Sequence, residues 1–286
     1  MRVITESRII MMKWMLRILT VILAAVFLYS SYQLFGQYRK YAQIEEVHSE
    51  IIQLVVQTVP TEELSPPSSQ SQQEMHTEHS SENNNPEAES SPEMAQPSIQ
   101  APIAVDFETL CGINPDVVGW LYCEGTSINY PVLKGESNDT YLYHQYDGSY
   151  SEGGSIFMDY RCAGDFSDDY TVIYGHNMLA DSMFNCLDYF REQEYLEEHS
   201  RFFYLSSDGK NYCLDVICTN LTAYRDDLRL FELRDDERNL ELIRDRAEAD
   251  SGIEVNNEDQ MVLLATCTYD FKNARCTLLC KVTPIR

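Results

Sequence analysis

The chain of 286 residues is long enough for one or two domains with a buried core. Hydrophobic residues make up 44% of it, which excludes a wholly disordered protein, and 46 acidic residues against 21 Lys and Arg give a net charge of −25. Such a surface repels phosphate backbones, so we expect no nucleic-acid partner. It also repels anionic lipid headgroups, so any attachment to a membrane has to be hydrophobic.

Charge divides the chain into three regions. Residues 1–56 have a local charge of +2, residues 57–105 of −8, and residues 106–286 of −19. We interpret these regions, in that order, as an anchor, a spacer and a folded head.

Residues 18–37 carry no formal charge. A helix of this length spans the hydrocarbon core of a bilayer, which is about 30 Å thick. Cations at Arg8, Lys13 and Arg17 precede the run, so the positive-inside rule places residues 1–17 in the cytoplasm and the head outside the cell. The sequence thus predicts a single-pass signal-anchor in the cell membrane that contacts lipid; a cleaved signal peptide is the alternative.

Residues 38–56 are predicted to continue the helix as a juxtamembrane extension. Ile44, Val47, Ile51 and Leu54 follow a heptad-like spacing. A dimerising stalk is one interpretation, although two heptads are too few to establish it.

Residues 57–105 have a different composition from the rest of the chain. They hold seven of the ten prolines and eight glutamates, and they have no aromatic residue and no glycine. Such a segment buries too little apolar surface to offset its ordering entropy. We therefore expect a disordered acidic linker that holds the head away from the bilayer.

Residues 106–286 alternate short apolar runs with turn residues, which predicts a mainly β fold. The predicted strands are 118–123, 128–133, 154–158, 171–174, 201–206, 212–219, 261–267 and 276–282, and the predicted helices are 140–145, 182–189 and 235–249. Eight strands with few helices indicate a closed or nearly closed barrel, and a two-sheet sandwich would give a similar pattern.

His176 is the histidine whose position suggests chemistry. It follows the apolar run 170–174 and Gly175, so it stands where a strand passes into a loop. His144 and His199 are more simply packing or surface residues. A structural role is also open for His176 when it is considered alone.

All nine cysteines lie in the predicted head. No C-x-x-C pair or Cys/His cluster has the spacing of a metal site, so we expect neither a metal nor another cofactor. An odd count leaves at least one thiol unpaired. Several cysteines lie within apolar runs, where a small buried thiol is the simplest interpretation.

Cys267 ends a buried strand, and Arg275 enters the next strand eight residues later. If those strands are antiparallel neighbours, the two residues come to adjacent ends. Acyl transfer by a thiol needs a nucleophile, a proton donor for the leaving amine and stabilisation of the oxyanion. Cys267, His176 and Arg275 would supply these in turn, and a guanidinium remains charged at any relevant pH.

These residues carry a resemblance to a known family. Tyr174-Gly175-His176, Leu264-Ala265-Thr266-Cys267 and Arg275, in this order, resemble the His, T-L-x-T-C and Arg signatures of sortases. The head resembles class B sortases in particular, in segments 114–121, 128–132, 138–142 and 154–160 and in the insertion 235–249 before the cysteine strand. Two positions depart from the pattern: Leu263 stands where Thr or Ser is usual, and Cys276 where an aromatic or aliphatic residue is usual.

The resemblance implies an eight-stranded sortase-type β-barrel over residues 106–286 and a membrane-anchored cysteine transpeptidase of a Gram-positive bacterium. Such an enzyme cleaves the C-terminal sorting signal of a secreted protein through a thioester. It then joins that protein to an amine of a lipid-linked peptidoglycan precursor or to a pilin-type lysine. The resemblance also implies that Asn138, Tyr174 and Thr266 bind substrate, although each could simply pack.

Two other functions fit parts of the pattern. A cysteine endopeptidase would use the same residues and would resolve the acyl-enzyme with water. A non-catalytic stalked surface-binding protein would leave the convergence of His176, Cys267 and Arg275 unexplained.

Overall fold

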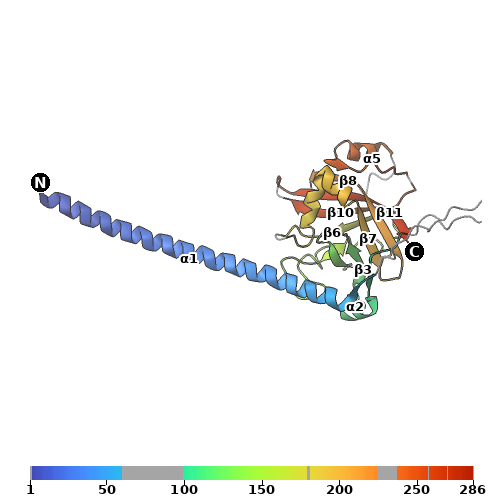
Figure 1. Cartoon of the computed structure of the whole chain (residues 1–286), viewed down its shortest axis with the longest axis horizontal. Helices are drawn as coiled ribbons and strands as arrows, with labels where there is room; N and C mark the ends of the chain where they lie inside the picture. The colour runs from blue at the N-terminus through green and yellow to red at the C-terminus, as the bar shows by residue number, and fades with distance from the viewer. Residues whose placement is uncertain are drawn as a thin grey trace, which may run out of the picture.

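The computed structural model describes residues 2–59, 99–178, 181–223, 237–256, 258–268 and 270–285. It consists of a β-rich head and one long helix that projects from it (Figure 1). The helices are α1 (Arg2–Val55), α2 (Phe107–Ile113), the 3-10 helix η1 (Asn185–Arg191), α3 (Gln193–Glu198) and α5 (Glu237–Arg244). The strands are β1 (Val56–Thr58), β2 (Ile103–Val105), β3 (Val117–Tyr122), β4 (Asn129–Leu133), β5 (Ile156–Met158), β6 (Tyr170–Tyr174), β7 (Arg201–Ser206), β8 (Asn211–Ala223), β9 (Ala249–Asp250), β10 (Met261–Thr268) and β11 (Ala274–Ile285).

Eight strands of the head close into a barrel. They follow the order β11-β10-β6-β5-β4-β3-β7-β8, and β8 pairs with β11 to complete the ring, while β9 adds to β8. All eight predicted strands are present, the third of them shortened to β5. The predicted barrel is therefore confirmed, and the alternative of a two-sheet sandwich is wrong.

Strands β6 and β10 are apolar at successive positions because both of their faces are covered. Ile173 and Leu264 point into the main core inside the barrel. Val172 and Leu263 lie in a separate buried cluster, to which Leu240 of α5 adds on the outer side. A strand that is buried on both faces gives a continuous apolar run rather than an alternating one.

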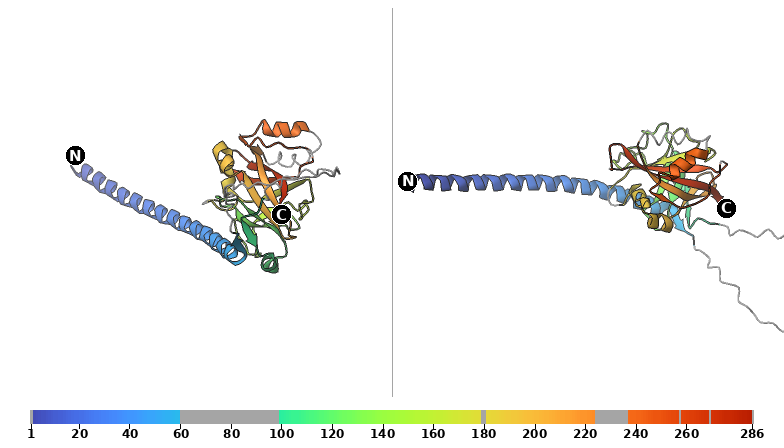
Figure 2. Two further views of the ribbon diagram at one scale, coloured as in Figure 1. Left: turned by 45° about the vertical axis from the view of Figure 1, so that its right-hand side comes forward. Right: turned by 90° about the horizontal axis from the view of Figure 1, so that it is seen from above.

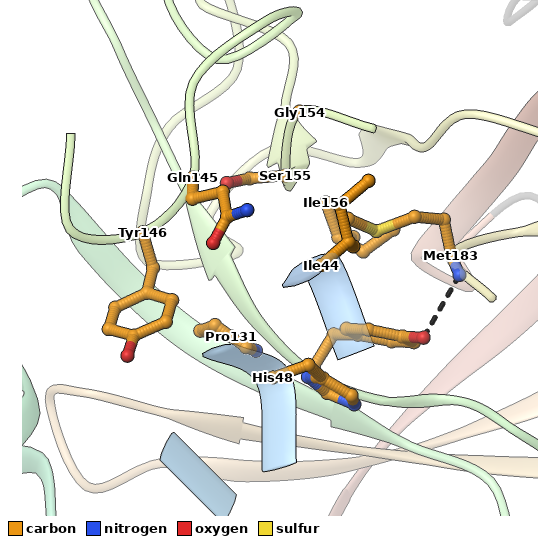
Figure 3. A pocket seen from close by; sticks show the side chains of 10 residues that line it. Ile44, His48, Pro131, Gln145, Tyr146, Gly154, Ser155, Ile156 and Met183 are labelled. Atoms are coloured by element: carbon orange, nitrogen blue, oxygen red, sulfur yellow. Dashed lines mark hydrogen bonds between the residues drawn. The ribbon is translucent and has the colours of Figure 1, made fainter. Parts of the chain in front are cut away.

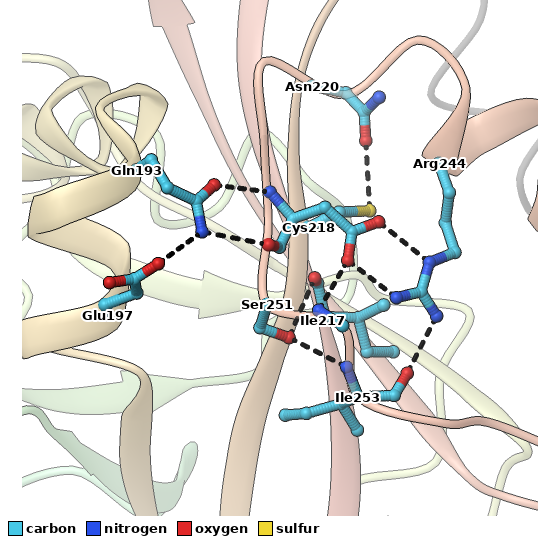
Figure 4. A network of polar contacts seen from close by, with 10 residues as sticks. Gln193, Glu197, Ile217, Cys218, Asn220, Arg244, Ser251 and Ile253 are labelled. Atoms are coloured by element: carbon cyan, nitrogen blue, oxygen red, sulfur yellow. Dashed lines mark hydrogen bonds and ion pairs between the residues drawn. The ribbon is translucent and has the colours of Figure 1, made fainter.

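The insertion between β8 and β10 is fixed to the barrel by a polar network (Figure 4). Arg244 donates to both carboxylate oxygens of Asp250, at 2.8 and 2.6 Å, and to the carbonyl of Ile253 at 2.7 Å. Asn220 on β8 donates to the carbonyl of Ile243 at 2.8 Å. The bond from Asn220 satisfies one carbonyl in the last turn of α5, and together these bonds hold the helix against the outer face of the sheet.

The helix predicted over 235–249 is shorter in the structure. It ends at Arg244, and the amide of Glu248 already donates to the carbonyl of Thr219 on β8, so the chain passes directly into β9. The start of the predicted helix, 235–236, lies outside the described residues. The helix predicted over 182–189 is the 3-10 helix η1, displaced by about one turn toward the C-terminus.

The helix predicted over 140–145 is wrong, because this segment forms turns. Its carbonyls are taken by distant donors: Tyr141 accepts from the amide of Ser155, and Leu142 accepts from the ring of His176. A helix would need those carbonyls for amides four residues further along the chain. Long-range hydrogen bonding therefore overrides the local helical pattern.

Helix α1 runs without a break from the expected membrane segment to Val55 and contacts the head through its last turns (Figures 1 and 2). Among the described residues it is the one helix long and apolar enough to cross a membrane, judged by length and composition. Ile51 and Val55 are buried in a cluster that includes Trp120 of β3. The ring of His48 stacks on Tyr130, with centroids 4.0 Å apart.

Figure 3 shows Ile44 and His48 of α1 directed toward Pro131, Ile156 and Met183 of the head. Ile44 is buried in the main core of the barrel. Because Ile44 and Ile51 pack on the head of their own chain, they are not available as the seam of a dimerising stalk. Leu54, the fourth residue of the heptad-like set, is exposed.

The ends of the expected linker lie side by side. Strand β1 pairs antiparallel with β2, with Val56 opposite Val105. Residues 60–98 lie outside the described residues. The two segments that flank residues 60–98 are therefore neighbours, and α1 contacts the head directly. This differs from the expectation that the linker separates the membrane from the head.

Substitutions on α1 test whether it docks on its own head. Ile51→Ala is expected to lower the free energy of unfolding of the full chain in detergent micelles by about 2–5 kcal/mol, because it leaves a cavity at a buried site. Leu54→Ala, on the exposed face of the same helix, is expected to change it by less than about 0.5 kcal/mol. Urea unfolding measures both, and equal effects would contradict the docked arrangement.

We expect the docking of α1 to depend on pH through His48. Burial lowers its pKa to about 4 from the ordinary 6.5. The docked state therefore binds a proton less readily than the undocked state. The docking free energy is fully present above pH 6.5 and falls by about 1.4 kcal/mol per pH unit as the pH drops toward 4.

Hydrogen-exchange protection factors of residues 44–55 measure this effect between pH 7 and pH 5. We expect protection to fall in the wild-type chain and to stay constant in His48→Phe, which keeps a ring against Tyr130 without a titrating group. A parallel pH dependence in the two chains would show that His48 is not responsible.

Candidate active site

A groove of about 310 Å³ opens at one end of the barrel. Its lining includes all six of the residues singled out in the sequence. The complete lining is Asn138, Asp139, Leu142, Phe157, Tyr174, Gly175, His176, Ala265, Thr266, Cys267 and Arg275. These residues come from segments up to 137 positions apart in the chain, and the barrel brings them to one place.

Cys267 and Arg275 face each other across two antiparallel strands. They are register partners near the end of β10 and the start of β11, as the sequence predicted. Thr266 and Thr268, on either side of the cysteine, are buried, whereas Cys267 itself is exposed. Alternation along the strand thus turns the thiol outward into the groove.

His176 reaches the groove because β6 runs parallel to β10. Tyr174 pairs with Ala265, and the amide of Gly175 donates to the carbonyl of Ala265 at 3.2 Å. The next residue in the chain is His176, at the same end of the barrel as Cys267. A Cβ at position 175 would lie 2.5 Å from the side chain of Ile156 and 2.7 Å from the ring of Phe184, so any larger residue would force these side chains to move.

The imidazole of His176 is held by its surroundings. Its Nε2 lies 2.7 Å from the carbonyl oxygen of Leu142, and its ring centroid is 5.8 Å from that of Tyr143. A carbonyl oxygen can only accept, so Nε2 carries a hydrogen in this contact, and Nδ1 is the ring nitrogen that the contact does not engage. The turn segment 140–145, whose sequence predicted a helix, therefore fixes the tautomer of this histidine.

A buried carboxylate holds two of the residues that line the groove, Asn138 and Tyr174. Asp159 is fully buried and accepts hydrogen bonds from Asn138 at 3.0 Å and from the Tyr174 hydroxyl at 3.3 Å. Arg161 donates to both of its oxygens at 2.8 Å. Burial alone would raise the pKa of Asp159, but the hydrogen bonds from Arg161 and Asn138 outweigh it and lower the pKa to about 2. The carboxylate therefore stays ionised.

The guanidinium of Arg275 stacks on the ring of Tyr174, whose hydroxyl donates to Asp159. Its Cζ lies 5.5 Å from the ring centroid of Tyr174, which is a favourable cation–π distance. Burial and the neighbouring Asp159 raise the pKa of Tyr174, so its hydroxyl remains protonated and donates to that carboxylate. Asp159 was missed in the sequence analysis; the signal was an acidic residue directly after an apolar strand, with an arginine two positions later.

The two departures from the family pattern have structural explanations. Leu263 points away from the barrel interior into the cluster that α5 covers, where an apolar side chain fits. Cys276 is fully buried in the main core, and its thiol donates to the carbonyl of Leu187 on η1 at 3.3 Å. Neither departure removes a group from the groove, which retains Thr266 beside the thiol.

All nine cysteines lie within the described residues and all are free thiols. Cys267 is exposed, Cys111 is partly buried and the other seven are buried. No group of three or more His, Cys, Asp and Glu side chains suited to a metal occurs in the described part of the chain. The groove therefore presents one accessible thiol, one imidazole and one guanidinium, a set of groups that can perform acyl transfer.

Comparison with known proteins relates this geometry to a family. No family model matches the sequence. Sortase B of Listeria monocytogenes is 33% identical over 176 residues, which cover 60% of this chain and 71% of that protein. Sortase B of Staphylococcus aureus is 29% identical over 198 residues, which cover 68% of this chain and 81% of that protein.

Solved structures of class B sortases share the fold. The crystal structure of S. aureus sortase B matches with a TM-score of 0.58 and 31% identity, over 63% of this chain and 87% of that one. The structure of Clostridium perfringens sortase B matches with a TM-score of 0.56 and 29% identity, over 62% of this chain and 100% of that one. Taken with the closed barrel and the groove, the relationship to the Listeria enzyme shows that the chain belongs to the class B sortases.

Proposed function

We propose that this class B sortase is a membrane-anchored cysteine transpeptidase in which Cys267 is the nucleophile, His176 the acid and base, and Arg275 the stabiliser of the oxyanion. The observation that carries the proposal is that the one exposed cysteine of the nine, all of which are described, lines the same groove as the histidine and the arginine.

The proposed reaction has two halves. The Cys267 sulfur attacks the carbonyl of the scissile peptide in a C-terminal sorting signal, the C–N bond breaks, and protonated His176 gives a proton to the leaving amine. An incoming amine then attacks the thioester and gives its proton to His176. The C–S bond breaks, so the Cys267 thiolate and protonated His176 are regenerated and a new amide bond forms.

Arg275 is suited to its role by position and by chemistry. It is the register partner of Cys267 and its charge does not depend on pH in the working range. Its guanidinium offers several N–H donors to an oxyanion formed at the carbonyl attacked by Cys267. The guanidinium stacks on the ring of Tyr174, and the hydroxyl of Tyr174 donates to Asp159. These contacts hold the guanidinium in place before substrate binds.

Solved structures of relatives support both halves of the reaction. S. aureus sortase B has been solved as a substrate complex, and a sortase B has been solved complexed with triglycine. For this chain we propose a secreted protein with a C-terminal sorting signal as the first substrate, bound by Asn138, Tyr174 and Thr266. The second substrate is an amine of a lipid-linked peptidoglycan precursor or a pilin-type lysine; a Streptococcus pyogenes class B sortase with 29% identity is described as involved in pilus biogenesis.

The proposed topology follows from α1. Residues 18–37 cross the cell membrane with residues 1–17 in the cytoplasm, and the head lies outside. Because α1 continues into its docking site on the head, the barrel would sit close to the outer membrane surface, where both substrates are tethered.

Cys267→Ala is expected to abolish transpeptidation, because no other exposed thiol is present among the nine. The assay mixes the full chain with a sorting-signal peptide and an amine nucleophile and identifies products by mass spectrometry. Cys111→Ala, which removes the partly buried thiol, is the matched control and should retain full activity. Product formation by Cys267→Ala would refute the proposal, and hydrolysis alone by the wild type would indicate the endopeptidase instead.

Arg275→Lys is expected to lower kcat/KM by about 100-fold, because a lysine keeps the charge but loses the fork of donors and the stacking on Tyr174. Arg201→Lys, in an exposed pair with Asp215 on β7 and β8, serves as the control and should stay within about twofold of the wild type. Steady-state kinetics on the same peptide measure both. Unchanged kcat/KM in Arg275→Lys would remove the guanidinium from the mechanism.

A further inference from the structure

The 3-10 helix η1 makes polar contacts beside each of the three groups assigned above. It is anchored in the barrel core by Cys186, Leu187 and Phe190, which are buried almost completely. Asp188, Arg191 and the carbonyl of Leu187 contact the segments that carry His176, Cys267 and Arg275. A short, well-packed element thus touches three separate parts of one site.

The first contact is beside His176. Asn177, the next residue, donates from Nδ2 to Oδ2 of Asp188 at 2.9 Å and accepts from Asn185 at 2.6 Å. The carbonyl of His176 itself accepts from the amide of Phe184, directly before η1, at 2.9 Å. The backbone at the histidine is therefore held on η1 by both its side-chain neighbour and its own carbonyl.

The second contact is beside Cys267. Asp270, three residues later in the loop between β10 and β11, accepts from both Nη atoms of Arg191 at 3.1 Å. Thr268, adjacent to the cysteine, donates to the same carboxylate at 2.6 Å. Arg191 also pairs with Glu248 before β9, so the guanidinium joins η1 to two further segments. Arg191 therefore forms a small ion-pair network with two carboxylates rather than a single pair.

The third contact is beside Arg275. The thiol of Cys276 donates to the carbonyl of Leu187 at 3.3 Å from a fully buried position. Burial, and then the charge of Asp188, raise the pKa of this thiol, so it stays protonated and able to donate. The hydrogen bond to Leu187 is a structural role for Cys276, at a position where the family pattern has an aromatic or aliphatic residue.

We propose that Asp188 and Arg191 are positioning residues, which act through Asn177 and Asp270 to hold His176 and Cys267 in reactive alignment. The proposal rests on the function assigned above to those two residues. Misplacing a reacting group by about 1 Å can cost about 100-fold in rate. Removing the side chain of Asp188 or of Arg191 should therefore slow the chemical step. Substrate binding along the groove walls, which η1 does not line, should change little.

The test compares substitutions that remove the polar group of Asp188 or Arg191 with conservative substitutions at the same positions. Arg191→Met and Asp188→Leu remove the two anchors, whereas Arg191→Lys keeps a cation and Asp188→Asn keeps an acceptor for Asn177. Arg201→Met removes an arginine–carboxylate pair of similar geometry on β7 and β8, outside the groove lining, and serves as the control. Full-length protein is used throughout, and the concentration of reactive Cys267 is titrated with a small electrophile before each assay.

We expect Arg191→Met and Asp188→Leu to lower kcat per titrated Cys267 by about 10- to 100-fold with KM within threefold of the wild type. Arg191→Lys and Asp188→Asn should recover part of the loss, and Arg201→Met should show none. A role in folding alone would lower the titrated fraction and leave kcat per titrated site unchanged.

Two results would overturn the proposal in distinguishable ways. If both anchor variants keep kcat per titrated site within twofold of the wild type while Cys267→Ala is inactive, η1 does not position the site although the proposed function stands. If Cys267→Ala is active, the proposed function fails and the positioning role fails with it.

Discussion

The grouping of His176, Cys267 and Arg275 in one groove depends on the pairing of three neighbouring strands. Strand β10 lies between β6, to which it is parallel, and β11, to which it is antiparallel. Only this combination brings the C-terminal ends of β6 and β10 and the N-terminal end of β11 to the same end of the barrel. A slip of one residue in β10 would turn Cys267 into the interior and expose Thr266, because side chains alternate along a strand. The buried apolar side chains on both faces of β10 oppose such a slip.

Around this frame, polar groups that the core alone would not fix are held by hydrogen bonds between distant segments. Asp159 is buried and ionised, and it connects Asn138 to Tyr174, on which Arg275 stacks. Removing one partner from such a network leaves a buried charge unsatisfied, which is costly. The groove is therefore preorganised by groups that do not themselves react, a general requirement for electrostatic catalysis.

The N-terminal helix α1 packs on the head, whereas the sequence predicted a head that a flexible linker holds away from the membrane. Ile44 and Ile51 are buried against the barrel, and His48 stacks on Tyr130. The hydroxyl of Tyr130 accepts from the amide of Met183, in the segment between His176 and η1. Helix α1 and the segment that carries His176 are thus joined by a continuous set of contacts.

Much of the fold and the three reactive candidates could be predicted from the sequence. Apolar runs separated by turn residues located the eight barrel strands, and the order of His176, Cys267 and Arg275 suggested one site. The pattern of Ile44 and Ile51 is the same for self-association and for docking on the head, so sequence could not distinguish them. The segment 140–145 was misassigned, and Asp159, Asp188 and Arg191 were missed, because their partners are decided by tertiary structure: Arg191 meets Asp270 across 79 positions.

The central claim is that this chain forms a covalent acyl-enzyme at one sulfur. It is tested most directly by the intact mass of the wild-type protein after reaction with a sorting-signal peptide in the absence of an amine. The account predicts an increase equal to the acyl part of the peptide, located on Cys267 by peptide mapping and removed by added hydroxylamine. An adduct on any other residue, or transpeptidation product formed with no adduct at Cys267 under rapid quenching, would contradict it.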